Sequence, residues 1–142
     1  YNNYQYPMVQ INITYEGDLH CHLVHAPSGA TVETDAPLDN KGRGESFSPT
    51  DLVAAALGSC MATIMGIKAR DRELDISGTA ITVQKEMTSQ PVRKIGRLIV
   101  DILLPREYSD EEMIVLRNAA HTCPVMKSLN PDIIVETTFR HK

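Results

Sequence analysis

Apolar and polar residues alternate in three short runs near the start of the chain. The runs cover residues 8–15, 19–25 and 30–34, and Glu16-Gly17-Asp18 and Pro27-Ser28-Gly29 separate them. A period of two is typical of strands with one buried face, and short turn sequences between such runs are typical of hairpins. The pattern therefore predicts a three-stranded meander. It is followed by a surface loop over residues 35–47, where no apolar period is present.

The period of the pattern changes after this loop. Ser48, Pro49 and Asp51 combine an N-cap residue, a proline at the first helical position and an acid three residues after the cap. This combination predicts a helix, which should run to about Arg70. Its apolar residues occupy nearly the whole circumference, so we expect it in the centre of the fold. Its most apolar segment, residues 52–67, is shorter than the roughly 20 residues that span a bilayer, which favours a buried helix over a membrane anchor.

The second half of the chain predicts two strands, two helices and a last strand. Residues 76–88 and 94–104 are β-branched runs joined by Ser89-Gln90-Pro91, which indicates an antiparallel pair. A capping box from Ser109 to Glu112 opens a helix that ends near His121, and a shorter helix starts at Thr122-Cys123-Pro124. Residues 133–140 alternate as a strand. The element order predicts one α+β domain over residues 1–142, with residues 1–6 left out as a disordered or extraneous tail.

Composition narrows the class of protein. The chain has 142 residues, of which 42% are hydrophobic and 23% charged, as is typical of one globular domain. Its net charge is −4 and only 5% of its residues are aromatic. Nucleic-acid binding needs a basic face and stacking platforms, so nucleic acid is not an expected partner. An odd count of three cysteines, without a visible secretory signal, favours a reducing compartment, and we expect a cytoplasmic protein.

Two cysteines are candidates for chemistry. Cys60 lies in the middle of the long predicted helix beside Gly58 and Ser59, and Cys123 lies 63 residues later at the start of the short helix. A free cysteine is often a small core residue, and this remains the alternative for each. Amide groups at a helix start favour thiolate, so the sequence predicts that Cys123 has the lower pKa. The spacing does not decide whether the two thiols meet.

The histidines allow several interpretations. His121 precedes Cys123 by two residues and either assists a thiol or simply suits the end of a helix. In the segment His20-Cys21-His22 a strand would turn both imidazoles away from the thiol. No second ligand cluster with zinc-like spacing is present in the sequence, so no metal is expected. Cys21 is expected in the core, as are Met61 and Met65.

The run Phe47-Ser48-Pro49-Thr50-Asp51-Leu52-Val53-Ala54-Ala55-Ala56-Leu57-Gly58-Ser59-Cys60, followed by Cys123-Pro124-Val125, resembles the OsmC/Ohr superfamily of thiol-dependent peroxidases, closest to its YhfA-like branch. The resemblance implies antiparallel sheets around the long helix and an intertwined homodimer with active sites at the interface. The apolar helix independently favours burial against a second subunit. The resemblance further implies that Cys60 attacks a small apolar peroxide and that Cys123 resolves the product. An external thiol would then serve as reductant, and no cofactor or metal would be required.

The chain departs from the family pattern around the first cysteine. Family members pair an Arg from the N-terminal strands with a Glu ten residues before that cysteine, whereas this chain has Thr50 there and no Arg before Arg43. The candidate thiolate-activating groups are Arg43, Glu45, Thr50, Asp51 and His121. Because the usual Arg and Glu are missing, the alternative function is a non-catalytic OsmC-fold binder of small ligands or a thiol redox sensor.

Overall fold

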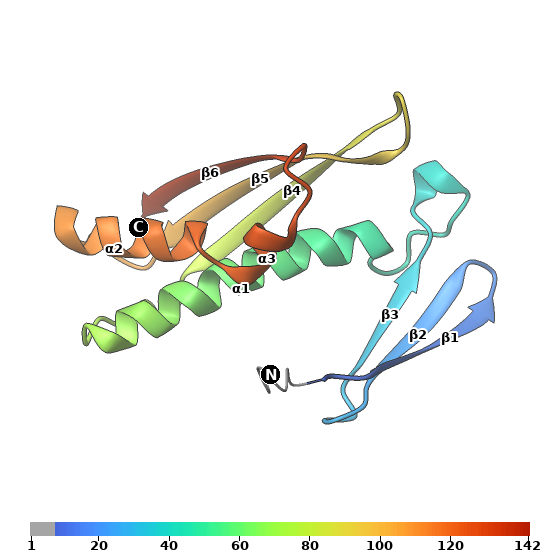
Figure 1. The fold of residues 1–142 in the computed structure, drawn as a ribbon, viewed down its shortest axis with the longest axis horizontal. Helices are drawn as coiled ribbons and strands as arrows, with labels where there is room; N and C mark the ends of the chain where they lie inside the picture. The colour runs from blue at the N-terminus through green and yellow to red at the C-terminus, as the bar shows by residue number, and fades with distance from the viewer. Residues whose placement is uncertain (1–7) are drawn as a thin grey trace, which may run out of the picture. The chain divides into compact units, whose positions relative to one another are not determined.

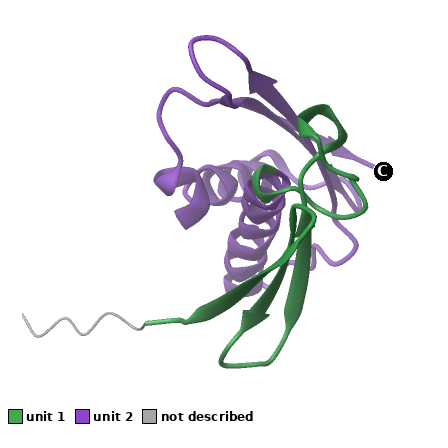
Figure 2. Ribbon diagram, turned by 90° about the vertical axis from the view of Figure 1, so that its right-hand side faces the viewer, with its two compact units in different colours: residues 1–50 green, residues 51–142 purple. Residues whose placement is uncertain are grey.

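The computed structural model describes residues 8–142, so the expectation for residues 1–6 lies outside the described residues. The described chain divides into two compact units (Figure 2). Unit 1 ends at Thr50, and unit 2 begins at Asp51 and runs to the last residue.

Unit 1 is the three-stranded antiparallel meander that the alternation predicts. Its strands are β1 (Ile11–Gly17), β2 (His20–His25) and β3 (Thr31–Asp35), in the order β1-β2-β3. The first turn places Asp18 and Leu19 at φ values of 52° and 61°. These left-handed values give a turn whose twist suits a tight hairpin. The loop after β3 includes one turn of 3-10 helix, η1 (Leu38–Asn40).

The two faces of this sheet differ in chemistry. Strand pairing places Ile13 opposite Leu23 and Leu23 opposite Val32, so these apolar residues form one row across the sheet. Ile13 is 62% exposed and Val32 is 42% exposed. A neighbouring row on the other face contains His22 and Glu33. Unit 1 therefore presents an uncovered apolar face and a polar face.

Unit 2 is a mixed sheet with helices on one of its faces (Figure 1). It contains α1 (Pro49–Asp71) from its third residue onward, β4 (Ala80–Thr88), β5 (Lys94–Leu104), α2 (Asp110–His121), α3 (Pro124–Ser128) and β6 (Ile134–His141). The strands β4 and β5 pair antiparallel, as predicted. In contrast, β6 runs parallel to β5, so the expectation of purely antiparallel sheets is wrong for this unit. The parallel pairing results from the crossover through α2 and α3, which returns the chain to the end of the sheet where β5 began.

The core of unit 2 lies between the sheet and its helices. Alternate residues of β5 from Leu98 to Leu104 are at most 1% exposed, and they pack with the buried faces of α1 and α2. The α1 face comprises Leu57, Met61 and Met65, each fully buried. The two methionines are therefore core residues, as predicted.

The other face of α1 is not covered within the chain. Ala55, Ser59, Thr63 and Ile67 are exposed, and Ile67 reaches 50%. The expectation that little of the helix meets water is therefore wrong for a single chain. By length and composition α1 is also apolar enough to cross a membrane, a test that core helices of soluble proteins pass as well. Only 33% of its most apolar 18-residue window is buried inside the chain.

Local sequence signals fix where several elements begin. In α2 the Ser109 hydroxyl accepts the Glu112 N–H at 3.2 Å and the Glu112 carboxylate accepts the Ser109 N–H at 2.8 Å, which confirms the capping box. The strand β4 starts four residues later than predicted. The Asp75 carboxylate accepts the Ser77 N–H at 2.8 Å, and Gly78 has a φ of +90°, so a turn occupies the first part of the predicted strand.

Candidate functional site

Cys60 lies on α1 where the helix packs closely on β4. A Cβ atom at Gly58 would lie 2.9 Å from Val83 Cγ2 and 3.4 Å from Ile81 Cγ2. The lack of a side chain at Gly58 thus allows the helix to approach the strand. The small residue at this position therefore serves close packing against neighbours that belong to unit 2. Cys60 itself is half-buried at the edge of the core.

Cys123 occupies the N-cap position of α3. Its Sγ accepts the N–H of Met126 at 3.3 Å, and the following Pro124 begins the helix. The residue is 0% exposed and belongs to the core of unit 2. Cap geometry therefore holds this sulfur in one position inside the protein.

The structure brings the Cys60 and Cys123 thiols together. Both are free, and Cys60 lies close enough to Cys123 to raise the pKa of its thiol. Burial raises the pKa of the Cys123 thiol, an effect that the amide hydrogen bond from Met126 opposes and the contact with Cys60 reinforces. The prediction of a lowered pKa at Cys123 is therefore wrong. Removal from water outweighs the amide groups of a helix that is only five residues long.

Three of the candidate activating residues lie in unit 1. Arg43 forms an exposed ion pair with Asp18, in which Nη2 and Oδ2 are 3.6 Å apart. The backbone N–H of Glu45 donates to Asp35 Oδ2 at 3.1 Å, and the hydroxyl oxygens of Thr50 and Ser48 are 3.2 Å apart. Both thiols belong to unit 2, so the roles of these three residues remain predictions.

The other two candidates, Asp51 and His121, lie in unit 2. Asp51 forms an ion pair with Lys85, with Oδ1 and Nζ separated by 2.8 Å. His121 donates from Nδ1 to the carbonyl oxygen of Arg117 at 2.8 Å, and its ring centroid is 6.4 Å from that of Phe139. Their action on a thiol also remains a prediction.

Sequence reasoning missed Lys85. Its side chain is only 13% exposed. Lysine is seldom buried without a charged partner, and here Asp51 is that partner. Lys85 shares the alternating inward positions of β4 with Val83 and Met87, which the period of the strand could have revealed. It places a cation beside Asp51, near the start of the helix that carries Cys60.

Around Cys21 the structure confirms the predicted strand, and it also shows carboxylate partners for the neighbouring histidine that the sequence did not predict. Cys21 pairs across the sheet with Tyr15 and Thr34, and it is half-buried rather than fully in the core. Hydrogen bonds with Asp35 and then Glu33 raise the pKa of His20. His20 and His22 thus lie beside Glu33 and Asp35, which are more than ten residues away in the sequence.

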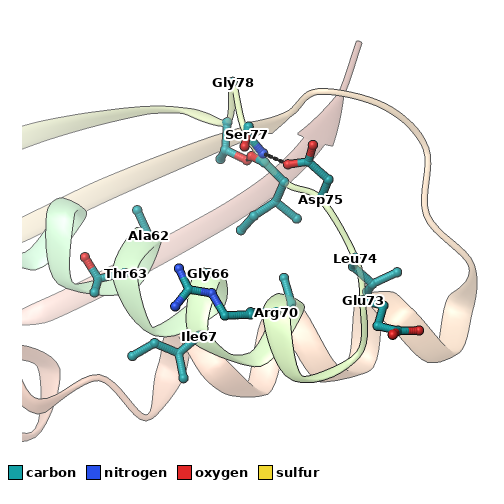
Figure 3. A pocket seen from close by; sticks show the side chains of 13 residues that line it. Ala62, Thr63, Gly66, Ile67, Arg70, Glu73, Leu74, Asp75, Ser77 and Gly78 are labelled. Carbon is teal, nitrogen blue, oxygen red and sulfur yellow. Dashed lines mark hydrogen bonds between the residues drawn. The ribbon is translucent and has the colours of Figure 1, made fainter.

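A pocket of about 590 Å³ lies between the C-terminal half of α1 and residues 73–79 (Figure 3). Gly66 and Arg70 form part of one wall, and the turn at Asp75 forms part of the other. Neither Cys60 nor Cys123 lines it, so this pocket is distinct from the thiol pair.

Comparisons with known proteins show the family and the fold of the chain. The profile of a family described as OsmC-like protein matches residues 42–138. A crystal structure from Psychrobacter arcticus 273-4, described as a candidate osmotic stress induced and detoxification response protein, is 44% identical, with a TM-score of 0.90 over 96% of this chain and 99% of that one. No curated protein matches the chain in sequence.

More distant structures share the fold. An organic hydroperoxide resistance protein OsmC from Legionella pneumophila is 13% identical, with a TM-score of 0.75 over 94% of this chain and 97% of that one. The organic hydroperoxide resistance protein OhrB of Bacillus subtilis is 20% identical, with a TM-score of 0.70 over 94% and 98%. At these identities the likeness concerns the fold alone.

Proposed function

The chain belongs to the OsmC-like protein family, and on that premise we propose that it is a cysteine-based peroxidase that reduces organic hydroperoxides. The proximity of the Cys60 and Cys123 thiols carries the proposal. Two thiols in contact can cycle between reduced and disulfide forms without a metal or organic cofactor. Placement in the YhfA-like branch and a cytoplasmic location, where external thiols are available, are part of the same proposal.

The difference in exposure supports separate roles for the two cysteines. Cys60 is half-buried and can be reached from outside the core, whereas Cys123 is 0% exposed. Burial also raises the pKa of the Cys123 thiol, which favours its protonated form at neutral pH. A protonated thiol is a poor nucleophile but can donate a hydrogen bond to the sulfur beside it. We therefore assign peroxide attack to Cys60 and resolution to Cys123.

The reaction has three balanced steps. The Cys60 thiolate attacks the outer oxygen of the hydroperoxide and the O–O bond breaks, which gives Cys60 sulfenic acid and an alkoxide that takes a proton to become the alcohol. The Cys123 sulfur then attacks the sulfenic sulfur, and water leaves as the disulfide forms. An external dithiol reduces this disulfide by two thiol exchanges and is itself oxidised to a disulfide.

A homodimer is a second part of the proposal. The apolar row through Ile13 and Val32 and the open face of α1 at Ile67 each leave large apolar side chains exposed in the single chain. Contiguous exposed apolar surface of this kind marks interaction sites in soluble proteins. We assign a second copy of the chain as the cover, with the active sites at the interface.

Peroxide consumption tests the catalytic part. With cumene hydroperoxide and dithiothreitol, the wild-type protein should show continuous turnover, and Cys60→Ser should fall to the uncatalysed rate. Cys21→Ser is the matched control, because Cys21 is the third free cysteine and has no role in the proposed cycle, and it should keep its activity. Absence of turnover with every alkyl peroxide would overturn the proposal. Equal slow rates for wild type and Cys60→Ser would favour the binder or redox sensor instead.

Trapping identifies which sulfur is oxidised first. One equivalent of hydroperoxide should give an intrachain Cys60–Cys123 disulfide in the wild type. In Cys123→Ser, sulfenic acid should accumulate on Cys60, where mass spectrometry of its dimedone adduct would locate it. An adduct on Cys123 in the Cys60→Ser variant, with Cys60 inert when alone, would reverse the assignment.

Molecular mass in solution tests the dimer. Sedimentation at micromolar concentration should give the mass of two chains, and Ile13→Asp should shift the population toward monomer. Thr14→Asp is the matched control, because adjacent residues of a strand point to opposite faces. A stable wild-type monomer, or equal effects of the two substitutions, would contradict the assigned interface.

A further inference from the structure

The polar face of the β1–β3 sheet gathers two histidines and three carboxylates. Pairing of β2 with β3 sets His22 opposite Glu33 and His20 opposite Asp35. His20 and His22 are two residues apart in a strand, so both point to this face. From the end of β1, Glu16 brings its Oε1 to 3.5 Å from His20 Nε2. These five side chains form what we call the histidine–carboxylate cluster.

Glu33 is the centre of the cluster. Its Oε1 lies 2.8 Å from His22 Nδ1, and its Oε2 contacts His20 Nε2. The other ring nitrogen of His20, Nδ1, lies 2.5 Å from Asp35 Oδ1. The Asp35 carboxylate is itself held by the N–H of Glu45 at 3.1 Å, and its side chain is only 7% exposed. A fixed carboxylate therefore orients the His20 ring with Nε2 toward Glu33.

The carboxylates of the cluster outnumber its imidazoles. Glu16, Glu33 and Asp35 contribute three negative charges within a few ångströms of two imidazoles. Like charges held this closely repel one another, and a divalent cation among them would offset most of that repulsion.

The donor atoms are spaced for a metal ion. One ligand atom each from Glu16, His22 and Glu33 lies within 4.8 Å of the other two. Zinc ligands sit roughly 2.0–2.2 Å from the ion, which places neighbouring donors roughly 3.4 Å apart in a tetrahedron. Since no two donors are more than 4.8 Å apart, no pair would need to close by more than about 1.4 Å, which rotation of the glutamate side chains permits. The half-exposed glutamates also leave the site open to ions from solvent.

The donor types select a class of metal. Calcium and magnesium take oxygen ligands, whereas imidazole nitrogen suits zinc and related transition metals. A second carboxylate that orients a neighbouring imidazole, as Asp35 does for His20, is the arrangement found around many metal-bound histidines. The geometry points to a site for a divalent transition-metal ion of the zinc class, held by Glu16, His22 and Glu33, with His20 beside it in contact with Glu33.

Sequence spacing could not find this site. The two histidines are separated by one residue, but Glu33 becomes their neighbour only through the register of β2 with β3. An ion at the proposed site would join the three strands of unit 1. The proposal for this site does not depend on the proposed peroxidase activity. Its test therefore uses binding and stability rather than turnover.

Zinc titration of the full chain tests the site. The protein carries Cys60→Ser and Cys123→Ser, so that this thiol pair cannot bind zinc. Calorimetry should show one zinc ion per chain, and zinc should raise the melting temperature, whereas millimolar magnesium should do neither. Cobalt in place of zinc should give visible absorption without the near-ultraviolet thiolate band, which would exclude Cys21 as a ligand.

Substitutions decide which residues hold the ion. His22→Gln and Glu33→Gln should each weaken zinc binding roughly 100-fold or more, and Asp35→Asn should weaken it roughly 10–100-fold, because it acts through His20. His25→Gln is the matched control on β2, because His25 lies on the face of the strand opposite to His20 and His22. Its Nδ1 lies 2.6 Å from Ser28 Oγ, and zinc binding should be unchanged. Circular dichroism checks that each variant is folded. No binding in the folded parent, or equal binding after His22→Gln and Glu33→Gln, would overturn the proposal.

Discussion

The two units of the chain treat their apolar residues in opposite ways. In unit 2 the alternate residues of β5 from Leu98 to Leu104 are at most 1% exposed and are covered by helices of the same unit. In unit 1, β1 is exposed from Ile11 through Glu16, although its sequence alternates just as clearly. Alternation thus identifies the face of a strand that seeks cover, but it does not say whether the same chain supplies that cover.

Truncation of a core residue in each unit should give the largest difference. Leu98→Ala removes a fully buried side chain from unit 2 and should lower the free energy of unfolding by about 2–5 kcal/mol. Ile13→Ala removes a side chain that is 62% exposed in unit 1, so at concentrations where the chain is monomeric it should cost less than about 1 kcal/mol. Urea unfolding measures both. Equal losses would show that unit 1 is covered to the same degree as unit 2.

The stability of unit 1 should depend more on the polar contacts of Asp35 than on the burial of apolar side chains. Asp35→Ala removes the acceptor of the Glu45 N–H and the partner of His20, and it should cost about 1–3 kcal/mol. Hydrogen exchange at the Glu45 amide should speed up in this variant. An unchanged exchange rate there would show that Asp35 does not hold the loop after β3.

Two glycines of α1 distinguish a packed position from an open one. At Gly58 a Cβ would meet Val83 Cγ2 at 2.9 Å, so Gly58→Ala should destabilise unit 2 by roughly 1–2 kcal/mol despite the better helix propensity of alanine. At Gly66 no atom lies within 4 Å of the added Cβ, and Gly66→Ala should stabilise by about 0.5–1 kcal/mol. Thermal unfolding measures the pair. The same sign for both would contradict the close approach of α1 to β4.

The smallest effect concerns the start of α2. Ser109→Ala removes one half of the capping box and should cost about 1 kcal/mol, measured by urea unfolding. Ser109→Asp retains a side-chain acceptor for the Glu112 N–H and serves as the matched control, with little loss expected. Equal losses in the two variants would show that the cap bond contributes nothing.

Much of the fold could be predicted from local signals. The strand β5 has the predicted bounds, and α1 and α2 begin where their cap residues indicate. The parallel pairing of β5 with β6 could not be predicted, because a period of two defines faces and carries no information about the direction of a partner. The late start of β4 was missed since Asp75 and Ser77 form their turn within an otherwise β-branched run.

The candidate site was less predictable than the fold. The residues Cys60 and Cys123 were recognised from motifs, but their contact depends on how α3 packs on α1. The direction of the Cys123 pKa was predicted wrongly, because helix position is visible in a sequence and complete burial is not. Similarly, Glu33 reaches His20 and His22 only through strand register.

The full enclosure of Cys123 also makes this sulfur a reporter of internal motion. A thiol reagent in solution can modify Cys60 in the native protein, but it reaches Cys123 only when the core of unit 2 opens. In a Cys60→Ser background, the rate at which a reagent labels Cys123 therefore measures how often that opening occurs. At low reagent concentration this rate depends on the equilibrium population of the open form, and at high concentration it approaches the opening rate itself.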